Sequence, residues 1–448
     1  MGSPIFGLFI LLQLVSICSV FVQSKQGTHS SNSSASVMFA LKTQHIPSGS
    51  GPRSASKLPF RHNVTLSVSL LVGTPPQPVI MVLDTGSELS WLHCKKDPKL
   101  KSVFDPVRST SYSPVPCTSP TCTTRTRDFP IPASCDPKKL CHTMVSYADA
   151  SYMEGTLAMD NFKMGGSSVP GVLFGCMDLS SSGNEEDSKT TGLLGMNLGS
   201  LSFVTQMGYP KFSYCISGQD SSGVLLFGQA NIPWLKPLSY TPLVKLSTPY
   251  RLPYYDRIAY SVQFQGIKVG GKLLSLPKSL LQPDHSGAGQ TMVDSGTQFS
   301  LLLGPVYKAL RSEFLAQTKG KLKELGDPYF VFQGVMDLCY RVPLTQEGYP
   351  PLPTVTLMFQ GAEMSVSAEQ LLYRVPGEVR GSDGVHCFTF GNSDLLGISA
   401  YIIGHHHQQN MWVEFDLANS RVGLAEVFNK SHNLSPFDFL RSYLKLVV

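Results

Sequence analysis

One short pattern occurs twice in this chain of 448 residues, and it constrains the fold more than any other feature. The first copy reads V-L-D-T-G-S and contains Asp84; the second reads M-V-D-S-G-T and contains Asp294. In each copy an apolar, strand-like run precedes the aspartate, and a turn of small hydroxyl residues and glycine follows it. Two halves that present one carboxylate each predict an acid/base pair built from both halves. Asp84 and Asp294 are therefore the candidate catalytic residues.

A second pair of motifs extends the duplication beyond the aspartates. G-L-L-G ends at Gly195, and Y-I-I-G ends at Gly404. Gly195 follows Asp84 by 195 − 84 = 111 residues, and Gly404 follows Asp294 by 404 − 294 = 110 residues. Nearly equal offsets indicate internal repetition, at a period far too long for a solenoid. We expect two lobes with the site at their interface, where clefts tend to form.

Residue patterning predicts an all-β, or at least mainly β, protein. Turn-forming residues are abundant, with 39 Gly and 32 Pro. Between them, apolar residues alternate with period two, as in Leu66–Gly73 and Ala259–Gly270, which is typical of strands. The best helical stretch is Pro305–Gln317, whose proline suits a first helical turn.

The charge pattern excludes one class of partner. The formal net charge is only +5, and the basic residues are scattered apart from one small cluster, Lys95, Lys96, Lys99 and Lys101. No aromatic residues interleave with this cluster, so we interpret it as a solvated loop. We expect no nucleic-acid partner.

Both ends of the chain differ from its β-patterned middle. Ile5–Val22 is apolar and Ser24 offers a cleavage site, which predicts a secretory signal peptide. The apolar run is near the ~18 residues of a membrane span, so an uncleaved signal anchor is the alternative. The expected organisation is a signal peptide (1–24), a pro-segment or disordered leader (25–57), an N-terminal lobe (58–230), an inter-lobe crossing (231–245), a C-terminal lobe (246–428) and an amphipathic tail (429–448).

Secretion determines how the cysteines are interpreted. In an oxidising compartment disulfides are expected before a zinc site, and the odd number left after signal removal leaves at least one thiol free or intermolecular. The remaining cysteines are Cys94, Cys117, Cys122, Cys135, Cys141, Cys176, Cys215, Cys339 and Cys387. Four sequons are candidate glycosylation sites: Asn32, Asn63, Asn429 and Asn433.

The chemistry of the predicted site follows from two carboxylates held a few ångströms apart. Such a pair cannot ionise fully and shares one proton. One oxygen then acts as general base on a water, while the partner donates a proton to the carbonyl under attack. Gly86 and Gly296 let backbone N–H groups approach the carboxylates, and the hydroxyls of Ser87 and Thr297 can orient the outer oxygens. This chemistry needs no metal or cofactor, and we expect none.

These motifs resemble the active-site motifs of the pepsin-like aspartic proteases, over about residues 60 to 428. Both glycine-ended motifs are similar to the family's two loops behind the dyad, and Val413–Ala425 is similar to its final strands. The resemblance implies two β-barrel-like lobes with the active site in the cleft between them. That cleft holds about seven or eight residues of extended peptide. Within the family, the chain resembles the plant atypical branch of nepenthesin and nucellin, and it has no room for a saposin-like insert.

The resemblance also assigns two residues beside the dyad. V-S-Y-A-D-A-S matches the flap hairpin, which makes Tyr147 the tyrosine that closes over substrate. Trp91 matches the tryptophan whose indole N–H reaches that tyrosine. Without the family match, Trp91 would be interpreted as a core residue and Tyr147 as a surface hairpin residue. The flap carries Ala where relatives often carry Gly, which implies a stiffer hairpin.

The cysteine pairing is implied by the same resemblance. We expect the disulfides Cys117–Cys141, Cys122–Cys135, Cys339–Cys387 and Cys94–Cys176, with Cys215 left over. The chain departs from the branch in having only Cys94 where relatives carry a Cys-rich stretch.

Three histidines follow Gly404, where the family usually has Asn or Asp. On a strand, His405 and His407 would share a face, so a zinc site is conceivable. No acidic or Cys partner is near in sequence. We therefore interpret the three histidines as a polar strand end that tunes the response to pH.

The sequence predicts an aspartic endopeptidase with an acidic optimum. We expect a monomer that acts on an extended polypeptide in the secretory pathway (cell wall or extracellular space, endoplasmic reticulum or vacuole), without a stable membrane anchor. The alternatives are a catalytically silent binding protein on this scaffold, such as a xylanase inhibitor, and a sugar-binding β protein. Both aspartates, both flanking hydroxyls and Tyr147 are intact, which favours the enzyme.

Overall fold

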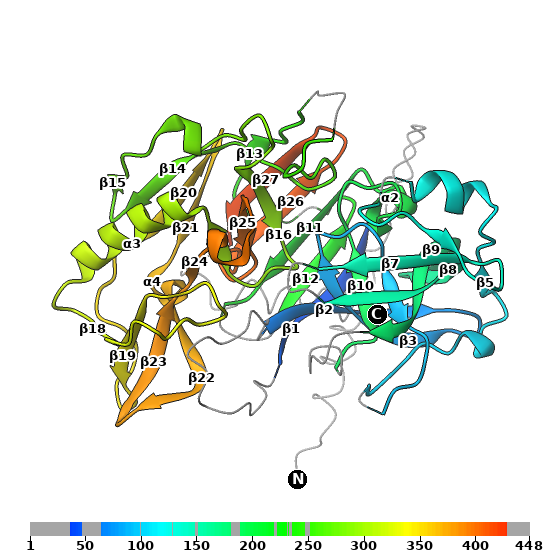
Figure 1. Ribbon diagram of the computed structural model, residues 1–448, viewed down its shortest axis with the longest axis horizontal. Helices are drawn as coiled ribbons and strands as arrows, with labels where there is room; N and C mark the ends of the chain where they lie inside the picture. Colours follow the sequence, from blue (N-terminus) through cyan, green and yellow to red (C-terminus); the bar gives the residue numbers. More distant parts are fainter. Residues whose placement is uncertain are drawn as a thin grey trace, which may run out of the picture. The chain divides into compact units, whose positions relative to one another are not determined.

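The chain is built mainly from strands, as predicted (Figure 1). The computed structural model describes residues 36–46, 64–98, 100–127, 129–147, 151–180, 189–218, 222–230, 232, 235–246 and 251–427. Its helices and 3₁₀ or π turns are α2 (Phe203–Met207), α3 (Gly304–Thr318), α4 (Ala368–Leu371), η1 (Pro106–Arg108), η2 (Thr121–Arg125), η3 (Lys278–Leu280) and η4 (Ser393–Leu396).

The strands of the first half are β1 (Val37–His45), β2 (Val64–Val72), β3 (Gln77–Asp84), β4 (Trp91–His93), β5 (Ser113–Pro114), β6 (Ser134–Cys135), β7 (Cys141–Ser146), β8 (Tyr152–Met164), β9 (Ser167–Ser180), β10 (Gly192–Gly195), β11 (Lys211–Ile216) and β12 (Ser222–Phe227). Those of the second half are β13 (Ser239–Pro242), β14 (Phe264–Val269), β15 (Lys272–Leu273), β16 (Gln290–Asp294), β17 (Ser300–Leu302), β18 (Lys323–Glu324), β19 (Cys339–Pro343), β20 (Val355–Phe359), β21 (Ala362–Val366), β22 (Leu372–Arg380), β23 (Asp383–Phe388), β24 (Phe390–Asn392), β25 (Ala400–Gly404), β26 (Met411–Asp416) and β27 (Arg421–Glu426).

Strands from both halves share one large sheet, whose order begins β13-β27-β26-β11-β12-β1-β2-β3. β26 comes from the end of the chain and pairs antiparallel with β11 of the first half. At this junction Phe212 pairs with Phe415, and their rings stack with centroids 4.7 Å apart. The halves are therefore joined by main-chain hydrogen bonds and by a shared core. β13 lies within the expected crossing, where it pairs with β27.

β1 lies inside this sheet, between β2 and β12. Leu41 pairs with Val68 on one side and with Gly223 on the other, and it is buried in the core. Of the two interpretations of residues 25–57, a disordered leader is therefore wrong for β1, whereas a pro-segment stays a prediction. Its alternating Val37, Phe39 and Leu41 carried a strand signal that the polar composition of the surrounding segment obscured. Residues 25–35 and 47–57 lie outside the described residues.

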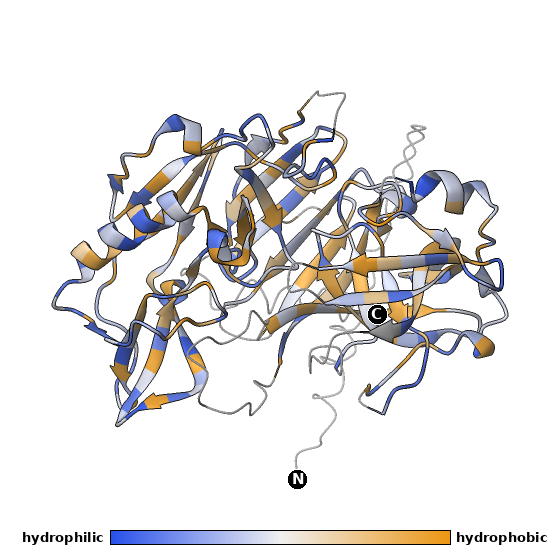
Figure 2. Cartoon of the chain, in the orientation of Figure 1, coloured by the Kyte–Doolittle hydropathy of each residue, from blue (hydrophilic) through white to orange (hydrophobic). Residues whose placement is uncertain are grey.

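The cores follow the predicted periodicities. Along β8 buried and less buried residues alternate, and Figure 2 shows strands on which apolar and polar residues succeed one another. The predicted helix is confirmed as α3, with Pro305 in its first turn. Val306, Leu310 and Phe314 recur four residues apart and are buried, so one face of α3 packs on the second half.

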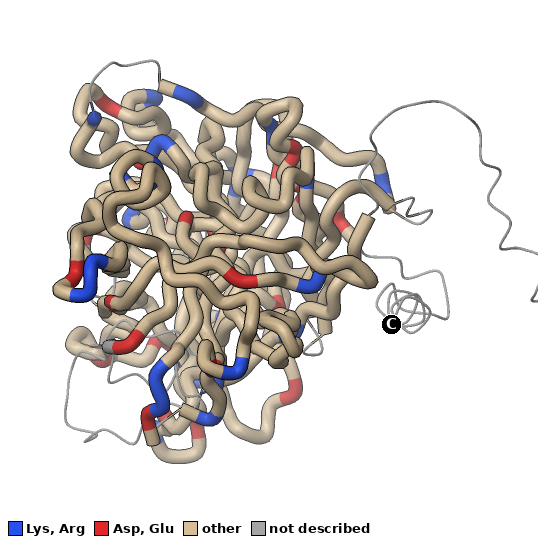
Figure 3. Tube along the Cα trace, turned by 90° about the vertical axis from the view of Figure 1, so that its right-hand side faces the viewer, with Lys and Arg blue, Asp and Glu red and all other residues tan. Residues whose placement is uncertain are grey.

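The charged residues are dispersed over the surface. Figure 3 shows Lys and Arg interspersed with Asp and Glu on the face it displays. Lys95, Lys96 and Lys101 are exposed, as expected for a solvated loop, and Lys99 lies outside the described residues. Within the described ranges, no helix has the length and hydropathy needed to cross a membrane.

Candidate active site

Asp84 ends β3, an outer strand of a local three-stranded arrangement whose central strand is β10. β10 runs parallel to β3 and pairs Gly195 with Asp84, while β4 returns antiparallel to β10. The residue that pairs with the aspartate is thus the one that the sequence offset had related to it. The backbone N–H of Met196 donates to the Asp84 carbonyl over 2.9 Å. This main-chain pairing holds the aspartate at the end of a buried strand.

Asp294 is positioned in the same way. β25 runs parallel to β16 and pairs Gly404 with Asp294, and β17 returns antiparallel to β25. The two nearly equal sequence offsets therefore correspond to the same strand register in both halves. A serine six residues after each aspartate accepts the N–H of the paired glycine, from Gly195 to Ser90 over 3.0 Å and from Gly404 to Ser300 over 3.1 Å.

Glycine is required at these pairing positions because other backbone lies very close. A Cβ on Gly195 would lie 2.5 Å from the carbonyl oxygen of Glu88. A Cβ on Gly404 would lie 2.5 Å from the carbonyl oxygen of Phe299. Both distances are shorter than non-bonded carbon–oxygen contacts allow. The loop after each aspartate can therefore pack against the paired strand only where that strand carries a glycine.

Each carboxylate is held by its own turn. The N–H of Gly86 donates to Asp84 Oδ1 over 2.8 Å, and the N–H of Gly296 donates to Asp294 Oδ1 over 2.9 Å. The hydroxyls of Ser87 and Thr297 donate to the Oδ2 atoms of their aspartates, the second over 2.6 Å. The structure therefore places the expected orienting residues around both carboxylates.

The two carboxyl groups face each other across the two turns. A Cβ on Gly296 would lie 2.2 Å from Asp84 Oδ1, and a Cβ on Gly86 would lie 3.0 Å from Asp294 Oδ1. The motif glycines thus make room for the opposite aspartate. Burial, followed by the negative charge of Asp294, raises the pKa of Asp84 to about 7, while the hydrogen bond from Ser87 acts in the opposite direction. The carboxyl pair therefore retains a proton in mildly acidic solution.

The residue directly after each aspartate joins the two halves, a role that the sequence motifs alone did not predict. The N–H of Thr85 donates to Ser295 Oγ over 3.1 Å, and the N–H of Ser295 donates to Thr85 Oγ1 over 2.8 Å. The hydroxyls donate onward to the carbonyls of Val293 and Leu83 in the opposite halves. The available signal was that both motifs carry a hydroxyl residue directly after the aspartate.

Tyr147 and Trp91 meet at β4, which pairs with β10, the partner strand of β3. Trp91 lies at the start of β4 and is buried, and its indole N–H donates to the Tyr147 hydroxyl over 2.5 Å. Tyr147 follows β7, and its N–H donates to the carbonyl of Ser151 over 2.9 Å, which closes the hairpin to β8. The tip of that hairpin, residues 148–150, lies outside the described residues.

The disulfides correct part of the expected pairing. The structure contains Cys94–Cys176, Cys339–Cys387, Cys117–Cys135 and Cys122–Cys141. The last two replace the expected Cys117–Cys141 and Cys122–Cys135. The β6–β7 hairpin places Cys135 opposite Cys141, and the bridge between Pro116 and Leu140 runs along the same edge. All four cysteines of this loop are therefore near one another, and the exact fold selects the partners. Cys215 is a buried free thiol.

The three histidines lie in a turn after β25, so the expectation that they continue a strand is wrong. His405 Nε2 lies 3.2 Å from the carbonyl of Val64, and His406 Nε2 lies 2.9 Å from that of Gln370. Burial lowers the pKa of His406 to about 4, which keeps its ring neutral. Within the described ranges, no group of three potential metal ligands occurs.

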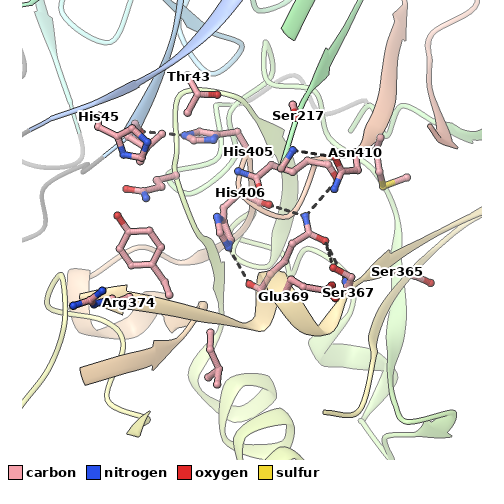
Figure 4. Close-up of a pocket in the computed structure, with 18 of the residues that line it drawn as sticks. Thr43, His45, Ser217, Ser365, Ser367, Glu369, Arg374, His405, His406 and Asn410 are labelled. Carbon is pink, nitrogen blue, oxygen red and sulfur yellow. Dashed lines mark hydrogen bonds between the residues drawn. The ribbon is translucent and has the colours of Figure 1, made fainter. Parts of the chain in front are cut away.

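A cavity of about 670 Å³ adjoins this turn (Figure 4). It lies between the ends of β1 and β2 and the segments around α4 and β22, and neither Asp84 nor Asp294 lines it. His45, His405 and Arg374 are among its lining residues. The cavity is therefore separate from the carboxylate pair. The four candidate sequons all lie outside the described residues.

Comparison with known proteins matches both halves of the chain. A family model described as "Xylanase inhibitor N-terminal" matches residues 67–229, and one described as "Xylanase inhibitor C-terminal" matches residues 259–426. The crystal structure of edgp aligns with a TM-score of 0.63 over 88% of this chain and 96% of that one. At 20% identity this likeness shows the fold alone.

Two relatives that are named as aspartic proteinases are similar over most of their length. Aspartic proteinase PCS1 of Arabidopsis thaliana is 62% identical over 399 residues, which is 87% of each chain. Aspartic proteinase nepenthesin-2 of Nepenthes gracilis is 29% identical over 363 residues, which covers 79% of this chain and 76% of that one. These proteinases do not favour the inhibitor alternative, in spite of the wording of the family models. The chain belongs to the pepsin-like aspartic protease family, with nepenthesin-like relatives, and is an aspartic-type endopeptidase.

Proposed function

We propose that Asp84 and Asp294 hydrolyse peptide bonds as a dyad that shares one proton. The observation that carries this proposal is the reciprocal fit of the two turns, in which each motif glycine leaves room for the opposite carboxylate. A water between the carboxyl groups is the nucleophile. One carboxylate removes its proton while the other carboxyl group protonates the substrate carbonyl, so charge need not build up on either side.

The proton is assigned to Asp84 in the resting enzyme. Burial and the charge of Asp294 raise the pKa of Asp84 to about 7. Asp84 is then the acid that protonates the carbonyl oxygen, and Asp294 is the base that activates water. As the tetrahedral intermediate collapses, the C–N bond breaks and the amine leaving group takes the proton that Asp294 received, while a hydroxyl of the intermediate returns a proton to Asp84 as the C=O bond re-forms. The pair titrates as a unit, so activity should follow a macroscopic pKa of the dyad.

Tyr147 is proposed to cover the substrate, with Trp91 as its support. Their hydrogen bond and the closed base of the hairpin support a defined position for the tyrosine. The substrate is an extended polypeptide, because an extended chain can expose one peptide bond to both carboxyl groups and offer its backbone to the flap. We propose that the enzyme works as a monomer.

The test is cleavage of a denatured protein across pH 3 to 7, with pepstatin and with the Asp84→Asn and Asp294→Asn variants. We expect cleavage that increases with acidity, is blocked by pepstatin and is reduced at least about 10³-fold in either variant. Cleavage that persists in folded variants would contradict the dyad. A correctly processed wild-type protein that binds pepstatin without cleaving protein would indicate a silent binder instead.

We also propose that the enzyme passes through the secretory pathway. The apolar N-terminus supports a signal peptide over 1–24, and four disulfides support an oxidising compartment. N-terminal sequencing of the mature protein tests whether residues 25–57 are removed as a pro-segment. A mature N-terminus within 58–63 would mean that β1 is part of a pro-segment. A start near residue 25 would mean that β1 belongs to the mature lobe.

A further inference from the structure

His407 connects the loop after Asp294 to a distant part of the second half. Its Nδ1 lies 2.7 Å from Ser300 Oγ, and its Nε2 lies 2.8 Å from Thr389 Oγ1. Ser300, His407 and Thr389 are all completely buried. The imidazole also stacks on Phe390, with centroids 4.2 Å apart and planes 25° apart. Contacts on both ring nitrogens and on one ring face hold the imidazole in a single orientation.

The hydrogen-bond partners determine where the protons lie. The Thr389 hydroxyl donates to the carbonyl of Gln370 over 2.7 Å, so toward His407 it can only accept. His407 therefore carries its proton on Nε2, and its Nδ1 accepts the proton of the Ser300 hydroxyl. Ser300 Oγ in turn accepts the N–H of Gly404. In the opposite tautomer Nδ1 would carry the proton, and the Ser300 hydroxyl would have no acceptor within this group. The Thr389 hydroxyl would then have to donate to Nε2, which would leave its oxygen lone pairs directed at the carbonyl oxygen of Gln370.

This chain of hydrogen bonds ends on the backbone that presents Asp294. β16 and β25 pair Asp294 with Gly404, and Ser300 is the sixth residue after Asp294. The loop is thus tied to β25 at its start by main-chain pairing and at its end by the Ser300 side chain. By orienting the Ser300 hydroxyl, His407 keeps the Ser300 lone pair directed at the Gly404 N–H. The Ser300 rotamer therefore contributes to the position of the loop, together with the main-chain hydrogen bonds of His405 and His406 to Thr297 and Gln298.

The first half lacks this support. Ser90 receives the N–H of Gly195 over 3.0 Å, as Ser300 receives that of Gly404. Three residues after Gly195 stands Leu198, however, where His407 stands three residues after Gly404. Leucine cannot accept a hydrogen bond. The two otherwise equivalent loops therefore differ in what orients the serine.

We propose that neutral His407 is a positioning residue for Asp294, acting through Ser300 and Gly404. This inference rests on the proposed role of Asp294 in the dyad. The groups packed on the ring from other elements, Ser300, Thr389 and Phe390, carry no charge. Burial, with the neighbouring His406 and His405, holds the pKa of His407 well below its usual value. The neutral ring that the proton arrangement requires therefore persists in acid.

The test compares His407→Leu with His407→Gln in pepstatin-sensitive cleavage of a fluorogenic peptide. His407→Leu copies the first half and removes both polar contacts. We expect kcat to fall about 10- to 100-fold, because small displacements of a reacting group are costly, with KM within about twofold since no substrate contact is lost. Glutamine can accept from Ser300 and donate to Thr389, so His407→Gln should recover kcat to within about threefold of wild type.

Two further variants keep the inference falsifiable. Thr389→Val removes the acceptor for Nε2 while keeping the shape, and it should lower kcat several-fold even if His407→Leu does not fold. His386→Gln replaces another histidine of the second half, which is half-buried on β23, and should leave kcat unchanged. A folded His407→Leu or Thr389→Val protein with wild-type kcat would overturn the proposal, as would equal losses in His407→Gln and His407→Leu. If wild-type enzyme shows no pepstatin-sensitive cleavage, the proposed dyad fails first.

Discussion

Thr85 and Ser295 bind each other across the two halves, each hydroxyl accepting the backbone N–H of the other residue. Both side chains are fully buried, and each hydroxyl also donates to a carbonyl of the opposite half. These hydrogen bonds connect the two active-site turns through the residues that directly follow the two aspartates. Relative motion of the halves cannot separate the aspartates without breaking four buried hydrogen bonds.

Removing one of these hydroxyls should therefore weaken both stability and catalysis. Thr85→Val or Ser295→Ala leaves a buried N–H without its acceptor, which costs about 1–3 kcal/mol in the free energy of unfolding. Urea unfolding of the two single variants and the double variant measures the coupling. We expect a coupling energy above about 0.5 kcal/mol, because each variant disrupts the same network. Strictly additive losses would show that the two hydroxyls act independently.

The raised pKa of Asp84 predicts that the folded enzyme is less stable at neutral pH. Between the ordinary value of 3.8 and about 7, the folded state binds this proton more tightly than the unfolded chain does. Raising the pH through this window therefore lowers the free energy of unfolding. Asp84→Asn has no such proton, so the variant should melt above wild type at pH 7.5, with a smaller difference at pH 4. Parallel melting curves at both pH values would contradict the assigned shift.

His93 predicts the opposite trend at acidic pH. Burial lowers the pKa of His93 to about 4, and within the described part of the chain its buried Nε2 has no hydrogen-bond partner. The unfolded chain takes up this proton near pH 6.5, so lowering the pH from 6.5 to 4 favours unfolding by up to about 3 kcal/mol. His93→Phe should lose less stability over this range in urea titrations. An unchanged slope would mean that His93 is accessible to protons when folded.

Together these two groups predict little change in stability across mildly acidic solution, because their contributions have opposite signs over the same pH window. The proton on Asp84 is lost toward neutrality, while His93 resists protonation toward strong acid. From about pH 4 to 6.5 the stability lost through Asp84 and the stability gained through His93 offset each other as the pH rises, so we expect a nearly constant melting temperature there. Calorimetry across pH 3 to 8 would show it. A melting temperature that changes steeply between pH 4 and 6.5 would contradict one of the two pKa shifts.

The Tyr147–Trp91 hydrogen bond should contribute to turnover. Tyr147→Phe leaves the buried indole N–H without this acceptor and releases the aromatic ring. We expect kcat/KM to fall about tenfold, an amount that corresponds to ~1.4 kcal/mol. Trp91→Phe should have a similar effect, and the double variant should be no worse than either single one. Additive losses would assign the two side chains to separate roles.

The disulfide correction is testable by peptide mapping. Digestion at acidic pH without reductant should yield Cys117 linked to Cys135 and Cys122 linked to Cys141. Replacing the second pair by serine opens a link between residues 19 apart in sequence and should cost about 3 kcal/mol. Peptides that join Cys117 to Cys141 would restore the pairing implied by family resemblance.

Several features could be predicted because they are repeated or local in the sequence. The aspartates and their glycines lie in two short motifs, and the offsets from Asp84 to Gly195 and from Asp294 to Gly404 anticipated the strand register. α3 was recognisable from its proline and its apolar spacing. Each of these signals lies within one segment or in a comparison of two similar segments, so no knowledge of long-range contacts was needed.

Other features depend on which distant segments meet. Four cysteines close together in sequence allow three pairings, and only the path of the β6–β7 hairpin selects one. β1 looked like part of a polar leader because the residues around it are polar and one of its two neighbours in the large sheet, β12, is distant in sequence.

The sequence by itself determined the two carboxylates, the duplicated half and the mainly β architecture, because these follow from local patterns and their repetition. Only the tertiary structure decided how the halves are held together and what orients each loop. Thr85 meets Ser295 across 210 residues, and His407 meets Ser300 across 107. Such contacts leave no periodic signal in a single chain, because hydrogen-bond partners are chosen by proximity after folding.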